Sequence, residues 1–243
     1  MSRLQEYYQR IQDVERDILA QESDTILRVS RLMAQTLKDG GRLFLFGCGH
    51  SHILVEEAFY RAGGLVPVHP VFDTAVMLHD GAVKSSAVEK SQSYGDWIFD
   101  RQGITAGDMV FVFSNSGING CPVEFASRSR QAGALVVSVT SRVYETREAT
   151  RHDSGLRLKD FSDYVLDTHV PYGDALVNCG RQQVAPGSTI ASALIWNMLI
   201  AQLSQEAEEM GCPAEFFVSG NVTGGQESNL RHIQKYRKEI PSL

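Results

Sequence analysis

Short apolar runs that alternate with helical patterns constrain the fold of this chain most strongly. Five runs are predicted to be strands, at residues 42–46, 65–71, 109–113, 134–139 and 164–167. Strands that are apolar along nearly their whole length, with helices between them, are typical of a parallel sheet covered on both faces. The pattern therefore predicts an α/β fold: a three-layer α/β/α sandwich around a five-stranded parallel sheet.

Helical spacing of apolar residues predicts the covering helices. Residues 4–38 are predicted to form two helices, with a break and a new N-cap at Glu22-Ser23-Asp24, ending at Gly40-Gly41. Residues 72–95 are interpreted as a long functional loop, and residues 141–161 as a loop or short helix. Further helices are expected at residues 51–62, 95–102, 122–132 and 188–204, with a C-terminal tail helix after the Gly-rich stretch 219–225.

Two polar turns each follow a predicted strand and lead into a helix. The first is Gly47-Cys48-Gly49-His50-Ser51, and the second is Ser114-Asn115-Ser116-Gly117-Ile118-Asn119. Such turns offer backbone N–H groups, serine hydroxyls and a positive helix N-terminus to an anion. In parallel sheets ligands bind beyond the carboxyl ends of the strands, where both turns lie. We therefore expect a phosphate to be held between them.

Three other well-known site motifs are absent. The spacing Gly47-x-Gly49 lacks the third glycine of a dinucleotide fingerprint, and no Gly-Lys-Ser/Thr of a Walker A loop occurs. No G-x-S-x-G nucleophile elbow occurs either. The paired turns therefore indicate a different kind of phosphate site.

Length and composition limit the class of protein. With 243 residues, 43% of them hydrophobic, the chain can bury the core of one large domain. No apolar stretch approaches the ~20 residues of a membrane span, and the N-terminus is unlike a secretory signal. The four cysteines lack C-x-x-C spacing, which fits a reducing compartment. We expect a cytoplasmic protein that binds neither membrane nor, given its net charge of −6, nucleic acid.

The second turn and its continuation, Val112–Gly117 through Ala132–Thr140, resemble the SIS (sugar isomerase) domain family, whose members bind phosphosugars. The segments Gly49–His52, Phe59–Gly64 and Pro171–Ala175 are similar to an uncharacterised bacterial subfamily described as phosphoheptose-isomerase-like. This resemblance implies a flavodoxin- or Rossmann-like fold.

The resemblance covers about residues 30–205, and it implies a single domain over residues 1–243. That domain would carry an N-terminal helical extension, residues 1–38, and a C-terminal extension, residues 206–243. Sites of this family tend to be completed by a partner subunit. We therefore expect a homodimer or homotetramer with the site near a subunit interface.

The resemblance also implies a set of phosphosugar-binding residues. Serines of the two turns would wrap the phosphate, and hydroxyls at the start of the last core helix would approach the ligand. The set is Gly49, His50, Ser51, Ser114, Asn115, Ser116, Asn119, Ser188 and Thr189.

Aldose–ketose isomerisation needs a base that removes a proton from the carbon next to a carbonyl. It also needs an acid that moves a proton between the two oxygens. Phosphoheptose isomerases carry their catalytic Glu at the position of Arg61 in this chain. Glu57 or Glu56 is the predicted base instead, although Glu57 and Arg61 could equally form a surface ion pair. His52 is the predicted acid, and enediol chemistry needs neither a metal nor another cofactor.

The resulting hypothesis is a phosphosugar isomerase. Two alternatives remain open at this point: a lyase or etherase that acts on an amino-sugar phosphate, and a non-catalytic phosphosugar sensor. The basic tail of Arg231, Lys235, Arg237 and Lys238 could be a solvated helix face or a cap toward an anionic ligand of a neighbouring subunit.

Overall fold

The computed structural model describes residues 1–243 and contains a five-stranded, fully parallel sheet, as predicted. The strands lie in the order β2-β1-β3-β4-β5. Their bounds are β1 Leu43–Gly47, β2 Val68–Pro70, β3 Met109–Phe113, β4 Leu135–Thr140 and β5 Tyr164–Asp167. The chain runs from β1 outward to β2 and then returns past β1 to β3, so the connections diverge between β1 and β3. Ligands of open parallel sheets bind at such a point.

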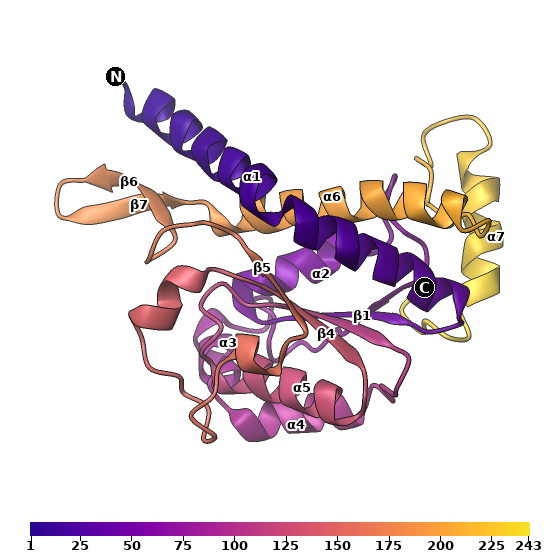
Figure 1. The fold of residues 1–243 in the computed structure, drawn as a ribbon, viewed down its shortest axis with the longest axis horizontal. Helices are drawn as coiled ribbons and strands as arrows, with labels where there is room; N and C mark the ends of the chain where they lie inside the picture. The colour runs from indigo at the N-terminus through magenta and orange to yellow at the C-terminus, as the bar shows by residue number, and fades with distance from the viewer.

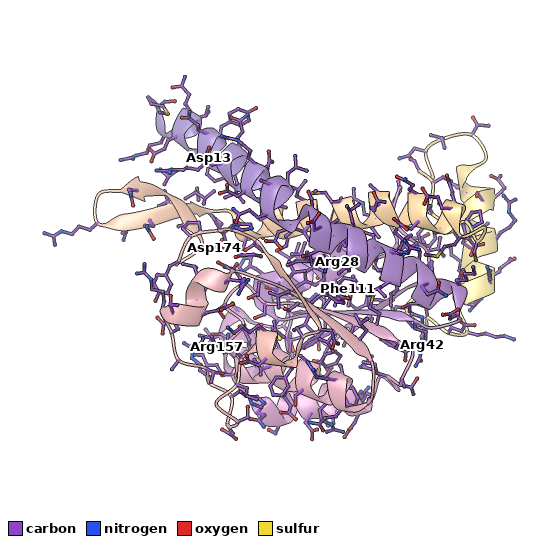
Figure 2. All side chains as sticks on the ribbon, in the orientation of Figure 1. Asp13, Arg28, Arg42, Phe111, Arg157 and Asp174 are labelled. Atoms are coloured by element: carbon purple, nitrogen blue, oxygen red, sulfur yellow. The ribbon has the colours of Figure 1, made fainter.

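Helices cover both faces of the sheet, which confirms the three layers (Figure 1). Alternate residues of β1 enter opposite cores: Leu43 and Leu45 pack with the helices of one face, and Phe44 and Phe46 with those of the other. Phe111 of β3 faces the same layer as Leu45 and lies in the middle of the molecule (Figure 2). The first layer holds α1 Arg3–Lys38, α2 Ile53–Ala58 and α6 Ser188–Glu209; the second holds α3 Ala82–Glu89, α4 Gln92–Asp100 and α5 Gly120–Gln131.

The N-terminal segment is one continuous helix, α1, so the predicted break at Glu22-Ser23-Asp24 is wrong. The polar triplet has partners inside the fold. The Glu22 side chain is buried and its Oε1 lies 2.9 Å from Nε2 of His169, while the Ser23 hydroxyl donates to the carbonyl of Leu19 one turn earlier. A tertiary contact and an intrahelical bond thus replace the cap that the pattern suggested.

Several other boundaries differ from the prediction. The helix expected at 51–62 is a 3₁₀ turn, η1 Gly49–His52, followed by the short α2, and Tyr60 has a φ of +48°. Residues 72–95 are not a single loop, because they contain α3 and the start of α4. The strand expected at 65–71 shortens to β2, which begins directly after Pro67 and ends at Pro70.

The C-terminal part adds elements outside the sheet. An antiparallel hairpin, β6 Ala175–Cys179 and β7 Gln182–Pro186, was not predicted and projects beside the N-terminal half of α1 (Figure 1). The expected tail helix is α7 Gly225–Tyr236, and short 3₁₀ turns lie at η2 Arg142–Thr146 and η3 Leu158–Phe161. None of the helices combines the length and the apolar composition that crossing a membrane requires.

Candidate functional site

A cavity of about 300 Å³ lies at the carboxyl edge of the sheet, between the turns that follow β1 and β3. Register places these turns together, because Gly47 at the end of β1 pairs with Phe113 at the end of β3. Seven residues of the predicted phosphosugar-binding set line this cavity: Gly49, His50, Ser51, Ser114, Asn115, Ser116 and Ser188. The structure therefore brings together residues that are far apart in the sequence.

The second turn is held in shape by the end of β4. The carbonyl of Asn115 accepts hydrogen bonds from the Thr140 hydroxyl at 3.2 Å and from the Ser141 backbone N–H at 2.8 Å. Gly117 has a φ of +62°, and a Cβ there would lie 3.0 Å from Oγ1 of Thr140. Only glycine fits this left-handed position without strain, so the tight turn follows directly from the sequence.

The second turn has hydrogen-bond donors at the cavity that no other group of the chain accepts. The backbone N–H groups of Asn115 and Ser116 donate to no carbonyl of the chain. The hydroxyl of Ser114 accepts the N–H of Gly117 at 3.3 Å, which leaves its own proton available. Hydroxyls and backbone N–H groups converging at one point are a common way to bind an oxyanion.

The start of α6 reaches the same cavity but is already occupied by a carboxylate of the chain. Asp174 accepts the backbone N–H of Ser188 at 2.7 Å and its hydroxyl at 2.6 Å. Asp174 therefore stabilises the positive end of α6. Ser188 lines the cavity, whereas Thr189 does not.

Asn119 lies behind the cavity and does not line it. Its side-chain amide donates to Oε1 of Glu89 at 2.7 Å, and its carbonyl accepts from the guanidinium of Arg151. Glu89 itself does line the cavity, with Ser85 and Ser86 of the same helix. The prediction missed this face, although Ser85 and Glu89 are spaced by one helical turn within 82–89.

The predicted catalytic residues lie outside this cavity. His52 is buried, with Nδ1 3.1 Å from Oε1 of Glu56, and burial lowers the pKa of His52 despite that carboxylate. Glu57 forms the ion pair with Arg61 that was considered as the alternative. Their catalytic role thus has no support from a shared cavity.

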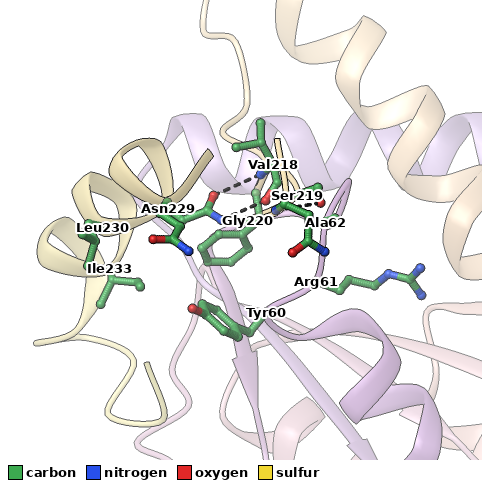
Figure 3. A pocket seen from close by; sticks show the side chains of 12 residues that line it. Tyr60, Arg61, Ala62, Val218, Ser219, Gly220, Asn229, Leu230 and Ile233 are labelled. Carbon is green, nitrogen blue, oxygen red and sulfur yellow. Dashed lines mark hydrogen bonds between the residues drawn. The ribbon is translucent and has the colours of Figure 1, made fainter. Parts of the chain in front are cut away.

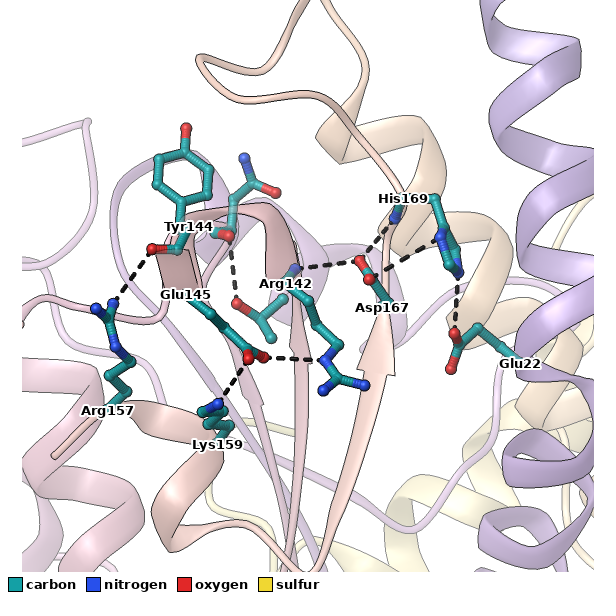
Figure 4. A network of polar contacts seen from close by, with 10 residues as sticks. Glu22, Arg142, Tyr144, Glu145, Arg157, Lys159, Asp167 and His169 are labelled. Carbon is teal, nitrogen blue, oxygen red and sulfur yellow. Dashed lines mark hydrogen bonds and ion pairs between the residues drawn. The ribbon is translucent and has the colours of Figure 1, made fainter. Parts of the chain in front are cut away.

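Ionic contacts hold η2 at the rim of the site (Figure 4). Glu145 accepts from Nε of Arg142 at 2.9 Å and from Nζ of Lys159 at 2.6 Å. Burial opposes ionisation of Glu145, but these two cations together hold the pKa of its carboxyl below the ordinary value. The network positions Tyr144, which belongs to η2 and lines the cavity.

A larger cavity of about 530 Å³ lies between Tyr60–Ala62 and the segment that leads into α7 (Figure 3). Arg61 is the only charged residue in its lining, and Asn229 there is hydrogen-bonded to both backbone groups of Val218. Elsewhere, no three His, Cys, Asp or Glu side chains are arranged to hold a metal ion. The cavity between the two turns is the better candidate site, because it contains seven residues of the predicted phosphosugar-binding set and the larger cavity contains none.

Comparison with known proteins gives a family match over more than half of the chain and a relative that matches nearly all of it. The SIS domain family matches residues 6–141. A UPF0309 protein of Halalkalibacterium halodurans is 38% identical, over 98% of this chain and 96% of the relative.

Solved structures of two enzymes share the fold. The phosphoheptose isomerase of Neisseria gonorrhoeae has a TM-score of 0.57 at 16% identity, covering 82% of this chain and 96% of its own. That of Francisella tularensis has a TM-score of 0.54 at 16% identity, covering 84% of this chain and all of its own. At such identities the likeness extends to the fold alone.

Proposed function

This chain belongs to the SIS domain family and to the UPF0309 family, and we propose that it binds a sugar phosphate and interconverts its aldose and ketose forms. The observation that carries the proposal is the convergence of the two turns on one cavity. The phosphate is bound by Ser51, Ser114 and Ser116, together with the backbone of the second turn. The sugar chain then extends past α3 and the start of α6.

The polar lining supports a ligand rich in hydroxyl groups, and the donors of the two turns support a phosphate on it, although the lining also contains the carboxylates Glu89 and Asp174. Apart from Leu78 and Ala82 of the α3 side, the lining consists mainly of serine, glycine and other polar residues. It contains neither lysine nor arginine, so neutral donors of the two turns supply the phosphate contacts. His50 is exposed at the entrance, where it can contact either the phosphate or the sugar.

The isomerase assignment is the more specific part of the proposal. Two structures with the same fold are named as phosphoheptose isomerases, which supports aldose–ketose chemistry but does not determine it, because one fold can serve several functions. Interconversion through an enediol requires a carboxylate and a second proton-transfer group near the bound sugar. Glu89 and His50 both line the cavity.

Binding is tested by calorimetry with a panel of sugar phosphates and their unphosphorylated parent sugars. We expect saturable binding of phosphorylated sugars only. Ser116→Ala should weaken it by about 10-fold or more, since a hydrogen bond to a charged group contributes about 1.5–3 kcal/mol. Ser93→Ala, on the exposed side of α4, is the matched control. Equal affinity of Ser116→Ala and wild type would contradict the phosphate site.

Turnover is tested separately, by proton NMR of each sugar phosphate that binds. Isomerisation yields one product of unchanged mass, whereas a lyase or etherase releases a second product. Binding without any change in the sugar would contradict the isomerase and retain the binding function.

A further inference from the structure

Glu89 differs from Asp174, the other carboxylate of the cavity, in the number of hydrogen bonds that it accepts. Asp174 accepts two hydrogen bonds from Ser188 at the start of α6. Glu89 accepts a single hydrogen bond, from Asn119, and its second oxygen has no partner within the chain. We infer that Glu89 is the catalytic base that moves the carbon-bound proton of the sugar phosphate, an inference that rests on the proposed function.

Close packing places Glu89 beside the phosphate-binding turn. Glu89 is the last residue of α3, and Lys90 follows it. A Cβ on Gly120, the first residue of α5, would lie 2.6 Å from the carbonyl oxygen of Lys90. Only the absence of a side chain at Gly120 allows this approach. The second turn ends at Asn119, directly before α5, so the same short segment carries both the phosphate donors and the partner of Glu89.

Asn119 is oriented toward Glu89 by the chemistry of its two neighbours. It occupies the N-cap position of α5, where an Asn side chain commonly accepts a backbone N–H, yet it makes no such bond. A guanidinium can only donate, so the Asn119 oxygen faces Arg151. The amide N–H₂ therefore faces Glu89 and donates to its Oε1 at 2.7 Å. This contact makes Asn119 a positioning residue that fixes the carboxylate.

The proton transfer is balanced without any co-reactant. A carboxylate oxygen of Glu89 takes the proton from C2 of the open-chain aldose, and the C–H electron pair forms the C1=C2 bond of the enediol. The carbonyl oxygen at C1 gains a proton as that bond forms. The hydroxyl at C2 then loses its proton, C2=O forms, and Glu89 returns its proton to C1. His50 is the only imidazole in the lining. It donates the proton to the C1 oxygen and accepts the proton from the C2 hydroxyl.

The test follows exchange of the carbon-bound hydrogen with deuterium oxide, by proton NMR, in the full-length protein. We expect the wild type to exchange it in a sugar phosphate that binds. Glu89→Gln keeps the shape and an acceptor for Asn119, and should slow exchange at least 100-fold while the Kd changes less than threefold. Glu227→Gln, on the exposed face of α7, is the control and should exchange as the wild type does.

Two further variants sharpen the test. Glu57→Gln examines the rival carboxylate outside the cavity, and its exchange should match that of the wild type. Asn119→Ala removes the contact that orients Glu89, so exchange should fall about 10-fold with an unchanged Kd. A purely structural role of Asn119 would instead lower binding and folding stability together.

The outcomes separate this inference from the proposed function. Exchange that persists in Glu89→Gln, or that is lost in Glu57→Gln alone, overturns the assignment of Glu89 and leaves the isomerase standing. If the wild type binds a sugar phosphate but does not exchange its hydrogen, the assignment of Glu89 as the base and the isomerase activity are both overturned. The sugar phosphate site is then retained. Absence of both binding and exchange overturns all three.

Discussion

His69 shows how a single buried side chain couples the stability of this protein to pH. It lies in β2 opposite Phe44 of β1, with the ring centroids 5.0 Å apart. Burial, aided by the charge of Arg42 and opposed by Asp108, lowers the pKa of His69 to about 4. The imidazole is therefore neutral in the folded protein at neutral pH.

The folded protein should lose stability as the pH falls through the ordinary pKa of histidine, near 6.5. Between pH 6.5 and about 4 the unfolded chain binds a proton at His69 that the folded protein does not, so stability decreases as the pH falls. From pH 7 to pH 5 this group should cost about 2 kcal/mol. Urea unfolding of the wild type and His69→Gln at both pH values measures the difference. An equal loss in both proteins would contradict the lowered pKa.

At the level of elements, α1 and α3 were predicted incorrectly from the sequence, each for a different reason. In α1 the Glu22-Ser23-Asp24 triplet resembles a helix start, but Glu22 is turned inward to His169. In α3 the apolar Val83 is exposed while Ser85 is buried and donates to the carbonyl of Val76. A helix that buries its polar side has no apolar stripe, so periodicity does not reveal it.

The continuity of α1 predicts the effect of Ser23→Ala. Inside a helix this change should leave the free energy of unfolding unchanged or raise it by up to about 0.5 kcal/mol, because alanine is the better helix former. At an N-cap it would instead lower that free energy by about 1 kcal/mol. Urea unfolding at neutral pH distinguishes the two results, and a loss of that size would indicate a break in α1.

For the whole molecule, the N-terminal end of α1 carries exposed apolar side chains. Its buried stripe runs through Ile18, Val14 and Ile11, the last packed against Leu176 and Val177 of β6, whereas Tyr8 and Leu4 near the end of the helix are 62% and 78% exposed. Figure 1 shows this half of α1 extending beyond the sheet beside the β6–β7 hairpin. Exposed apolar side chains that continue a buried stripe beyond the hydrophobic core are typical of a surface that packs against another chain.

We therefore predict that the protein associates with copies of itself through this part of α1. Light scattering after size-exclusion chromatography should give the mass of two or four chains. Tyr8→Glu should shift that mass toward one chain, because it places a charge in the apolar stripe. Gln9→Glu adds the same charge next to it on the polar side and should not. A wild type that elutes as a single chain would contradict the prediction.

The sequence alone determined the sheet and the two turns. Apolar strands and helical spacing are local signals, and glycines between a strand and a helix mark a tight turn, so the five strands and both turns followed from them. The placement of Gly49, Ser51, Ser114 and Ser116 in one cavity followed from the rule that turns after parallel strands share an edge.

Only the tertiary structure decided which charged groups face that cavity. Glu57 and Glu89 are both helical carboxylates near polar residues, and nothing local distinguishes them. The packing of Gly120 against Lys90 brings Glu89 to the site, whereas Glu57 turns to Arg61. Such contacts join residues distant in sequence, and their geometry depends on how whole helices pack.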